Sequence, residues 1–210
     1  MKIDKTLIIT SALCLAPILL GVLLYDRLPD SIPIHFDFAG DPDNWGAKPF
    51  VVFGMPALLC LLNIVCNVST RKYGGENQSM LLKFSRWLIA VIALIVVPIT
   101  LFKAIGADIP IEVIVPVLVG VIFIIIGNYL PKTKQNPVAG VRVKWTMESA
   151  ENWRRTSRFS GYLFIIGGFV MILNAFLAWF WIPVFFGILI AMIAGPVIYS
   201  YHMHRKEVRN

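Results

Sequence analysis

The chain has 210 residues, of which 58% are hydrophobic and 15% charged, and its mean hydropathy is +0.75. A soluble domain carries about 25% charged residues, and it could not cover this much apolar side chain with polar surface. The composition therefore excludes a water-soluble fold and indicates an all-α integral membrane protein. The net charge of +7 does not predict direct binding to nucleic acid, because the positive charges lie beside apolar segments.

Six apolar segments follow one another, and most approach the ~20 residues that a helix needs to cross ~30 Å of hydrocarbon. The segments are roughly Thr6–Leu24, Phe50–Val68, Trp87–Phe102, Ile111–Leu130, Phe159–Ala178 and Ile182–Tyr201. The first has no small-residue cleavage site after it, so we expect a retained span and not a signal peptide. The third is short and contains Pro98.

Residues 1–210 are predicted to form a single membrane domain. Residues 1–68 hold the first two spans with an outer loop, and residues 87–201 hold four spans around an inner loop at 131–158. The three cysteines, Cys14, Cys60 and Cys66, all lie in apolar segments. That position is typical of small buried hydrophobic residues, and it argues against a disulfide or a metal pair.

The distribution of basic residues predicts the orientation of the spans. With the N-terminus in the cytoplasm, sixteen of the nineteen Lys and Arg residues lie inside, and only Arg27, Lys48 and Lys103 lie outside. This arrangement satisfies the positive-inside rule in every loop, and the reverse orientation violates it. We therefore expect both termini in the cytoplasm. Trp179, Phe180 and Trp181 mark an outer turn between the last two spans.

The outer loop, residues 25–48, contains Ile32, Ile34, Phe36 and Phe38 at alternate positions. A period of two predicts a short extended segment with one apolar face. Residues 39–43 and 44–46 are rich in turn-forming residues.

Acidic residues of this loop have two interpretations. Asp37, Asp41 and Asp43 with His35 suggest a divalent cation site, but their spacing does not match an EF-hand loop. Aspartates in turns more often accept hydrogen bonds from backbone N–H groups, and we prefer that interpretation. No metal or cofactor is expected. The candidate partner-facing residues of the outer loop are His35, Asp37, Asp43, Trp45 and Lys48.

The inner loop is the most densely charged interval, with four Arg, one Lys, two Trp and two Glu between residues 136 and 158. We expect a brief extended strip at 141–145, followed by a helix that Thr146 caps and that begins at Met147. Met147, Ala150 and Trp153 would share one face of this helix, and Glu151 would pair with Arg155.

Two roles fit the inner loop. It is either an interfacial anchor that touches membrane lipids, or a docking surface for a cytoplasmic protein. The candidate partner-binding residues are Asn136, Gly140, Arg142, Trp145, Thr146, Glu151, Trp153, Arg154, Arg155 and Arg158.

Motifs in both loops resemble those of the SdpI-type bacterial immunity proteins. The outer loop, with Leu28-Pro29, residues 32–36 and Trp45-Gly46, is similar to a domain of unassigned function that commonly precedes the SdpI region. The second half resembles the SdpI motif itself. The matching positions there are Gly127, Asn128, Pro131, Asn136, Pro137, Gly140, Val141, Arg142, Trp145, Thr146, Glu151, Trp153, Thr156, Arg158 and Gly161. The chain departs from the family pattern at Lys144 and at Ser157, where the family often has Pro and His.

The resemblance implies a non-enzymatic protein of the bacterial cell membrane that gives immunity to a secreted peptide toxin. The toxin would meet the outer face. A cytoplasmic transcriptional repressor would be held at the membrane through the inner loop, which would make the protein a signal-transducing receptor.

Two other classes remain as alternatives. A transporter of small molecules or peptides usually has ionisable groups within the membrane, and the predicted spans have essentially none. The main polar side chains in the spans are Asn63, Asn67, Asn128 and Asn174, and interhelical hydrogen bonds explain them. A membrane enzyme would need a catalytic motif, and neither H-E-x-x-H nor G-x-S-x-G occurs.

Overall fold

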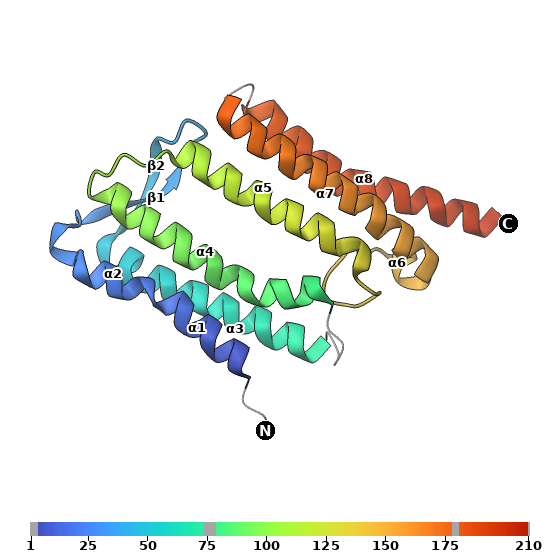
Figure 1. Cartoon of the computed structure of the whole chain (residues 1–210), viewed down its shortest axis with the longest axis horizontal. Helices are drawn as coiled ribbons and strands as arrows, with labels where there is room; N and C mark the ends of the chain where they lie inside the picture. Colours follow the sequence, from blue (N-terminus) through green and yellow to red (C-terminus); the bar gives the residue numbers. More distant parts are fainter. Residues whose placement is uncertain (1–3, 74–78, 178–180, 210) are drawn as a thin grey trace. The chain divides into compact units, whose positions relative to one another are not determined.

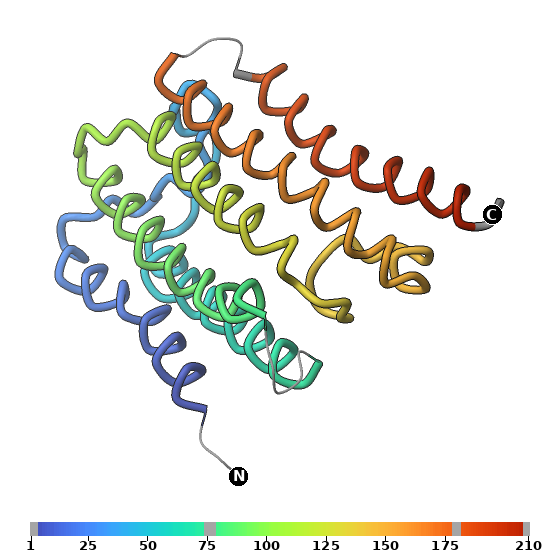
Figure 2. Tube along the Cα trace, turned by 45° about the vertical axis from the view of Figure 1, so that its right-hand side comes forward, coloured from blue at the N-terminus to red at the C-terminus, as the bar shows by residue number. Residues whose placement is uncertain are grey.

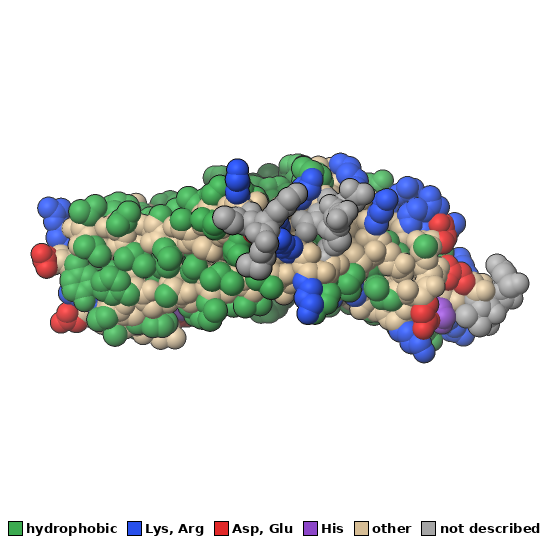
Figure 3. Space-filling model, turned by 90° about the horizontal axis from the view of Figure 1, so that it is seen from below, with side chains coloured by type: hydrophobic (Ala, Val, Ile, Leu, Met, Phe, Trp, Pro, Cys, Tyr) green, Lys and Arg blue, Asp and Glu red, His purple; other side chains and the backbone are tan. Residues whose placement is uncertain are grey.

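A computed structural model of the chain describes residues 4–73, 79–177 and 181–209. Within these ranges, six helices are long and apolar enough to cross a membrane, as predicted (Figures 1 and 2). Their bounds are Lys5–Leu23, Phe50–Tyr73, Met80–Ala104, Ile111–Lys132, Ala150–Leu177 and Ile182–Glu207. The chain is therefore a multi-pass membrane protein. Hydrophobic side chains cover much of the surface along the helices (Figure 3), which suits contact with lipid.

The chain forms two compact units. The first contains Met1–Lys72 and Lys83–Ile111, and the second contains Tyr73–Leu82 and Glu112–Asn210. The third span thus packs mainly with the first two.

In the first unit, Pro17 divides the first span into α1 (Lys5–Leu15) and α2 (Pro17–Leu23). Proline suits the first position of a helix because it has no N–H to donate. After a 3₁₀ turn at Tyr25–Arg27 comes the hairpin of the outer loop. A π-helical turn at Phe50–Gly54 then leads into α3 (Met55–Tyr73), and α4 (Met80–Ala104) follows.

The outer hairpin pairs β1 (Ser31–Phe36) with β2 (Pro42–Ala47) in antiparallel register. The extended segment predicted around Ile32 is confirmed. Ile32 is fully buried, in a cluster that includes Val51 and Leu101. The apolar side of the hairpin therefore seats it on the ends of the first three spans. The predicted turn at 44–46 is wrong, because these residues lie in β2, opposite residues of β1.

The second unit contains α5 (Ile111–Tyr129), a 3₁₀ turn at Leu130–Lys132, α6 (Lys144–Glu148), α7 (Ala150–Leu177) and α8 (Trp181–Arg209). Glycines bring α5 and α7 into close contact: a Cβ at Gly127 would lie 2.7 Å from the Gly161 carbonyl oxygen. Small residues allow this approach between membrane helices. Of the predicted outer turn, Trp179 and Phe180 lie outside the described residues.

The inner-loop helix differs from its prediction. Helix α6 begins at Lys144, ends at Glu148 and is separated from α7 by Ser149 in an extended conformation. Thr146 therefore lies within a short helix and does not cap one that starts at Met147. Because of this break, Met147 and Trp153 do not share one helix face as predicted. Trp153 is buried, whereas Met147 is 40% exposed.

Candidate functional site

The turn of the outer hairpin is organised by Asp37. Its Oδ1 accepts hydrogen bonds from the backbone N–H groups of Ala39, at 2.8 Å, and Asp41, at 2.9 Å. The interpretation of Asp37 as a turn residue is confirmed. His35 Nδ1 lies 2.5 Å from Asp43 Oδ1 across the hairpin, and both side chains are well exposed. Among the described residues, no three His, Cys, Asp or Glu side chains form a group that could hold a metal ion.

Trp45 and Lys48 have different surroundings, although both lie on the C-terminal side of the hairpin. Trp45 is 52% exposed. The side chain of Lys48 is 15% exposed, and its Nζ lies 3.3 Å from Asp30 Oδ1 and 5.2 Å from the centre of the Tyr25 ring. Lys48 is thus part of the base of the loop, whereas Trp45 is available for contact from outside.

The backbone of the inner loop is held by polar side chains of the loop itself. Asn136 Oδ1 accepts hydrogen bonds from the N–H groups of Val138 and Ala139, both at 2.9 Å. The Thr146 hydroxyl donates to the Val141 carbonyl at 2.7 Å and accepts from the Val143 N–H at 3.1 Å. These residues therefore shape the loop.

Trp153 is the buried centre of the inner loop, with 3% of its surface exposed. Its Nε1 donates to the Thr133 carbonyl at 2.8 Å. Gly140 adopts φ +128°, and a Cβ there would lie 2.6 Å from the Trp153 ring. The glycine is required both for the left-handed backbone and for the close contact with the indole.

Trp145 connects the inner loop to the C-terminal part of α8, which is predicted to lie at the cytoplasmic side. Its Nε1 donates to Ser200 Oγ at 2.7 Å, and its ring stacks on His204 with 5.9 Å between ring centres. Asn152 Nδ2 donates to the Ser200 carbonyl at 3.0 Å. The loop, α7 and α8 are thereby held as one block.

The arginines of the inner loop remain on the surface. Glu151 pairs with Arg155 at 2.5 Å, as predicted, and also with Arg154 at 2.7 Å. Arg142 donates to the Pro137 carbonyl, and Arg158 is exposed. The structure therefore separates the predicted residues into an internal framework and an exposed basic surface. The framework consists of Asn136, Gly140, Trp145, Thr146 and Trp153, and the basic surface consists of Arg142, Arg154, Arg155 and Arg158.

A polar network in the first unit was not predicted. Asp4 at the start of α1 lies 2.5 Å from the Arg86 guanidinium of α4, and Arg86 Nε donates to Asn67 Oδ1 of α3 at 2.8 Å. Asn63 Nδ2 donates to Thr10 Oγ1 at 3.0 Å, deeper along the same helices. Of the four asparagines predicted to make interhelical hydrogen bonds, Asn63 and Asn67 are confirmed. Asn128 Oδ1 instead accepts a hydrogen bond at 3.5 Å from Lys132, four residues further along the chain.

Arg86 was expected in a loop, but α4 begins at Met80, and the Arg86 side chain is only 14% exposed. The predicted start of the third span at Trp87 was therefore too late, because α4 already includes Lys83 and Arg86. The sequence did contain a sign of a polar contact: Asn63 and Asn67 are four residues apart, so both side chains lie on the same face of one helix and can reach the same neighbouring helix. Nothing in the local sequence identifies Arg86 as that neighbour.

Asp4 is ionised within this network. Its partial burial opposes ionisation, but the hydrogen bonds from Arg86 and Leu7 and the charges of Arg86 and Arg71 outweigh burial and lower the pKa of Asp4 below its usual 3.8. The Leu7 bond is also the N-cap of α1, at 3.2 Å.

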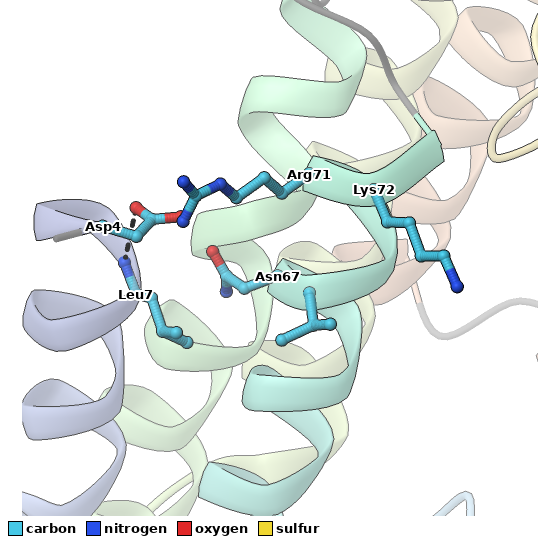
Figure 4. Close-up of a pocket in the computed structure, with 6 residues that line it drawn as sticks. Asp4, Leu7, Asn67, Arg71 and Lys72 are labelled. Atoms are coloured by element: carbon cyan, nitrogen blue, oxygen red, sulfur yellow. Dashed lines mark hydrogen bonds and ion pairs between the residues drawn. The ribbon is translucent and has the colours of Figure 1, made fainter. Parts of the chain in front are cut away.

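A cavity of about 380 Å³ opens beside this network, between α1 and α3 (Figure 4). Its lining residues are Asp4, Leu7, Asn67, Val68, Arg71 and Lys72. Arg71 extends toward Asp4 in Figure 4, with 3.8 Å between Nη1 and Oδ2, whereas Lys72 points away from Asp4. The cavity thus combines apolar walls with a charged rim.

Comparisons with known proteins match both halves of the chain. Residues 132–200 match the SdpI/YfhL protein family, and residues 12–60 match a domain of unknown function, DUF1648. The immunity protein SdpI of Bacillus subtilis (strain 168) is 25% identical over 203 residues, which cover 96% of this chain and 97% of that protein. No solved structure is significantly similar to the chain. The two regions occur in the predicted order and the similarity extends along nearly the whole length, so the predicted resemblance to the SdpI-type family is confirmed.

Proposed function

We propose that this chain is a membrane immunity protein, which protects a bacterial cell from a secreted peptide toxin. The observation that carries the proposal is the similarity to the immunity protein SdpI, because it extends over almost the full length of both proteins. The six spans and the paired family regions support the same conclusion.

In this proposal the toxin meets the outer hairpin. Three of its candidate residues, His35, Asp43 and Trp45, are exposed on a hairpin that is anchored by Ile32. A half-exposed Trp beside charged groups suits an amphipathic peptide, since aromatic residues are enriched where proteins bind one another. Asp37 and Lys48 are not contact residues in this proposal. Asp37 stabilises the turn of the hairpin, and Lys48 stabilises the base of the loop.

A cytoplasmic repressor would dock on the basic surface defined above, Arg142, Arg154, Arg155 and Arg158. Exposed arginines supply contact with acidic groups of a protein, and Arg is enriched at interfaces. The two tryptophans and Thr146 are positioning residues in this proposal, because their polar atoms already have partners within the chain.

The immunity proposal predicts rescue of a sensitive strain. We expect expression of the chain in Bacillus subtilis cells that lack SdpI to restore survival in the presence of the toxin that SdpI counters. A Trp45→Ala/Asp43→Asn variant should accumulate normally but protect less, because both substitutions alter only the exposed side of the hairpin. Survival is measured by colony counts after toxin exposure.

The matched control is Arg154→Gln/Arg155→Gln, which alters the inner surface and should leave survival unchanged while weakening any repressor recruitment. A chain that reaches the membrane at wild-type abundance and gives no protection would contradict the immunity proposal.

A further inference from the structure

The C-terminal part of α8 is held against the inner loop by contacts with α6. The Trp145 ring centre lies 5.4 Å from that of Tyr201 and 5.9 Å from that of His204. One turn further along α8, Glu207 Oε1 accepts a hydrogen bond from the Ser149 hydroxyl at 3.1 Å. Lys144, the first residue of α6 and the neighbour of Trp145 in the sequence, therefore lies beside the end of α8.

Helix α8 continues beyond the apolar part of its span. From Ile182 to Tyr201 it contains no charged residue, and this stretch covers about 30 Å, the thickness of the hydrocarbon core. The same helix runs on to Arg209 (Figure 2), which adds about 12 Å, whereas a head-group layer is only about 5–8 Å thick. An amphipathic anchor would lie flat in the interface. The end of α8 instead projects toward the cytoplasm in the predicted orientation.

Positive charge is in excess around this projection. Residues 131–158 and 202–210 together contain ten Lys and Arg residues and three Glu residues. Residues 74–78, which lie outside the described part of the chain, contain one further acid, Glu76, and the excess remains when it is counted.

The cations of this region differ in whether an acid neutralises them. Glu151 pairs with both Arg154 and Arg155. By contrast, Lys144, Arg205 and Lys206 are exposed, and no ion pair or side-chain hydrogen bond joins them to any residue that the structure describes. An incoming carboxylate would therefore compete with no acid of the chain at these three positions, whereas at Arg154 and Arg155 it would compete with Glu151.

We propose that Lys144, Arg205 and Lys206 form a docking surface, here named the tail surface, for an acidic segment of a cytoplasmic protein. The inference rests on the cytoplasmic docking role proposed above, and it moves the principal contacts from the paired arginines of α7 to α6 and α8. Tyr201 is 48% exposed and lies one turn from Arg205 on the same face of α8, so it supplies an apolar contact beside the cations. Exposed cations around an aromatic side chain complement a segment that carries both carboxylates and apolar side chains.

Binding of an acidic peptide to the full chain, in nanodiscs of zwitterionic phosphatidylcholine at physiological ionic strength, tests the proposal. The probes are a fluorescent helical peptide rich in Glu and Leu and a counterpart with Gln in place of every Glu, and anisotropy gives the Kd. We expect tighter binding of the Glu peptide. Lys144→Gln/Arg205→Gln should raise its Kd about five- to tenfold, because two exposed charge contacts are lost. The control Lys5→Gln/Lys83→Gln removes the same charge from exposed positions of the first unit and should change the Kd little.

A second comparison separates specific docking from general attraction to positive charge. Arg154→Gln/Arg155→Gln also removes two cations from the second unit, but Glu151 already pairs with them, so the Kd should rise less than in Lys144→Gln/Arg205→Gln. Equal losses in these two variants would overturn the proposal. Equal affinity of the wild-type chain for the two peptides would also overturn it, and would leave lipid head groups as the contacts of these cations.

Survival in the presence of the toxin distinguishes this proposal from the immunity proposal. Lys144→Gln/Arg205→Gln leaves the outer hairpin unchanged, so it should protect cells as well as the wild-type chain does. Intact protection without preferential binding of the Glu peptide would overturn the tail surface alone, whereas absence of protection by the wild-type chain would contradict the immunity proposal.

Discussion

Replacing Trp153 with Ala is expected to destabilise the second unit by about 3–5 kcal/mol, the usual cost of removing a buried Trp side chain. Trp153 is 3% exposed, its Nε1 donates to the Thr133 carbonyl, and its ring fills the space beside Gly140. The substitution would leave a cavity and an unpaired carbonyl. Unfolding of the purified protein in mixed micelles, followed by the loss of helical circular dichroism, measures the change.

Two further variants separate the contributions to this effect. Trp153→Phe retains much of the ring and loses the hydrogen bond, so it should cost about 1–2 kcal/mol. Gly140→Ala should also destabilise the unit, because it combines a left-handed φ with a Cβ 2.6 Å from the indole. Gly106→Ala is the control. Gly106 also has a positive φ, but no atom lies within 4 Å of the position of a new Cβ, so this substitution should destabilise the protein less. Equal costs at the two glycines would contradict the assigned contact.

Replacing Arg86 with Gln is expected to destabilise the first unit by about 2–3 kcal/mol. Breaking a buried ion pair costs about 3–5 kcal/mol, and we expect less because the Asp4 and Arg86 side chains keep 13% and 14% exposure. The loss arises mainly because Asp4 is left ionised and partly desolvated. Equilibrium unfolding in mixed micelles at neutral pH, followed by circular dichroism, measures this loss of stability.

A double-mutant cycle with Asp4→Asn isolates the interaction. The double variant should be destabilised by clearly less than the sum of the two single variants, because removing Asp4 also removes the unpaired charge. Arg155→Gln breaks an exposed ion pair and should cost less than about 1 kcal/mol. Additive effects of Asp4→Asn and Arg86→Gln would show that the pair does not act as a unit.

The sequence predicted those features that depend on local patterns. Long apolar segments located the six spans, the alternation around Ile32 located β1, and residue spacing predicted the pair of Glu151 and Arg155. Helix ends were predicted less well, because α4 begins at Met80, before the predicted start at Trp87, and includes Lys83 and Arg86.

The rest depends on residues distant in sequence. The contact of Asp4 with Arg86 joins positions 82 residues apart, and that of Trp145 with Ser200 joins positions 55 apart. Spacing therefore could not show that both tryptophans of the inner loop would have their N–H groups bonded within the chain. The extended backbone at Ser149, which divides the expected helix, has by contrast a local cause: the Ser149 hydroxyl accepts a hydrogen bond from the Asn152 N–H at 3.1 Å, as an N-cap of α7 does.

The orientation of the spans underlies both proposed surfaces, and topology mapping tests it most directly. Single cysteines introduced after Lys48 and after Lys134, in a chain whose three native cysteines are replaced by alanine, can be labelled in intact cells with a membrane-impermeant maleimide. The account predicts that the cysteine after Lys48 is labelled in intact cells, and that the cysteine after Lys134 is labelled only after the membrane has been permeabilised. Labelling of both sites from the same side would contradict it.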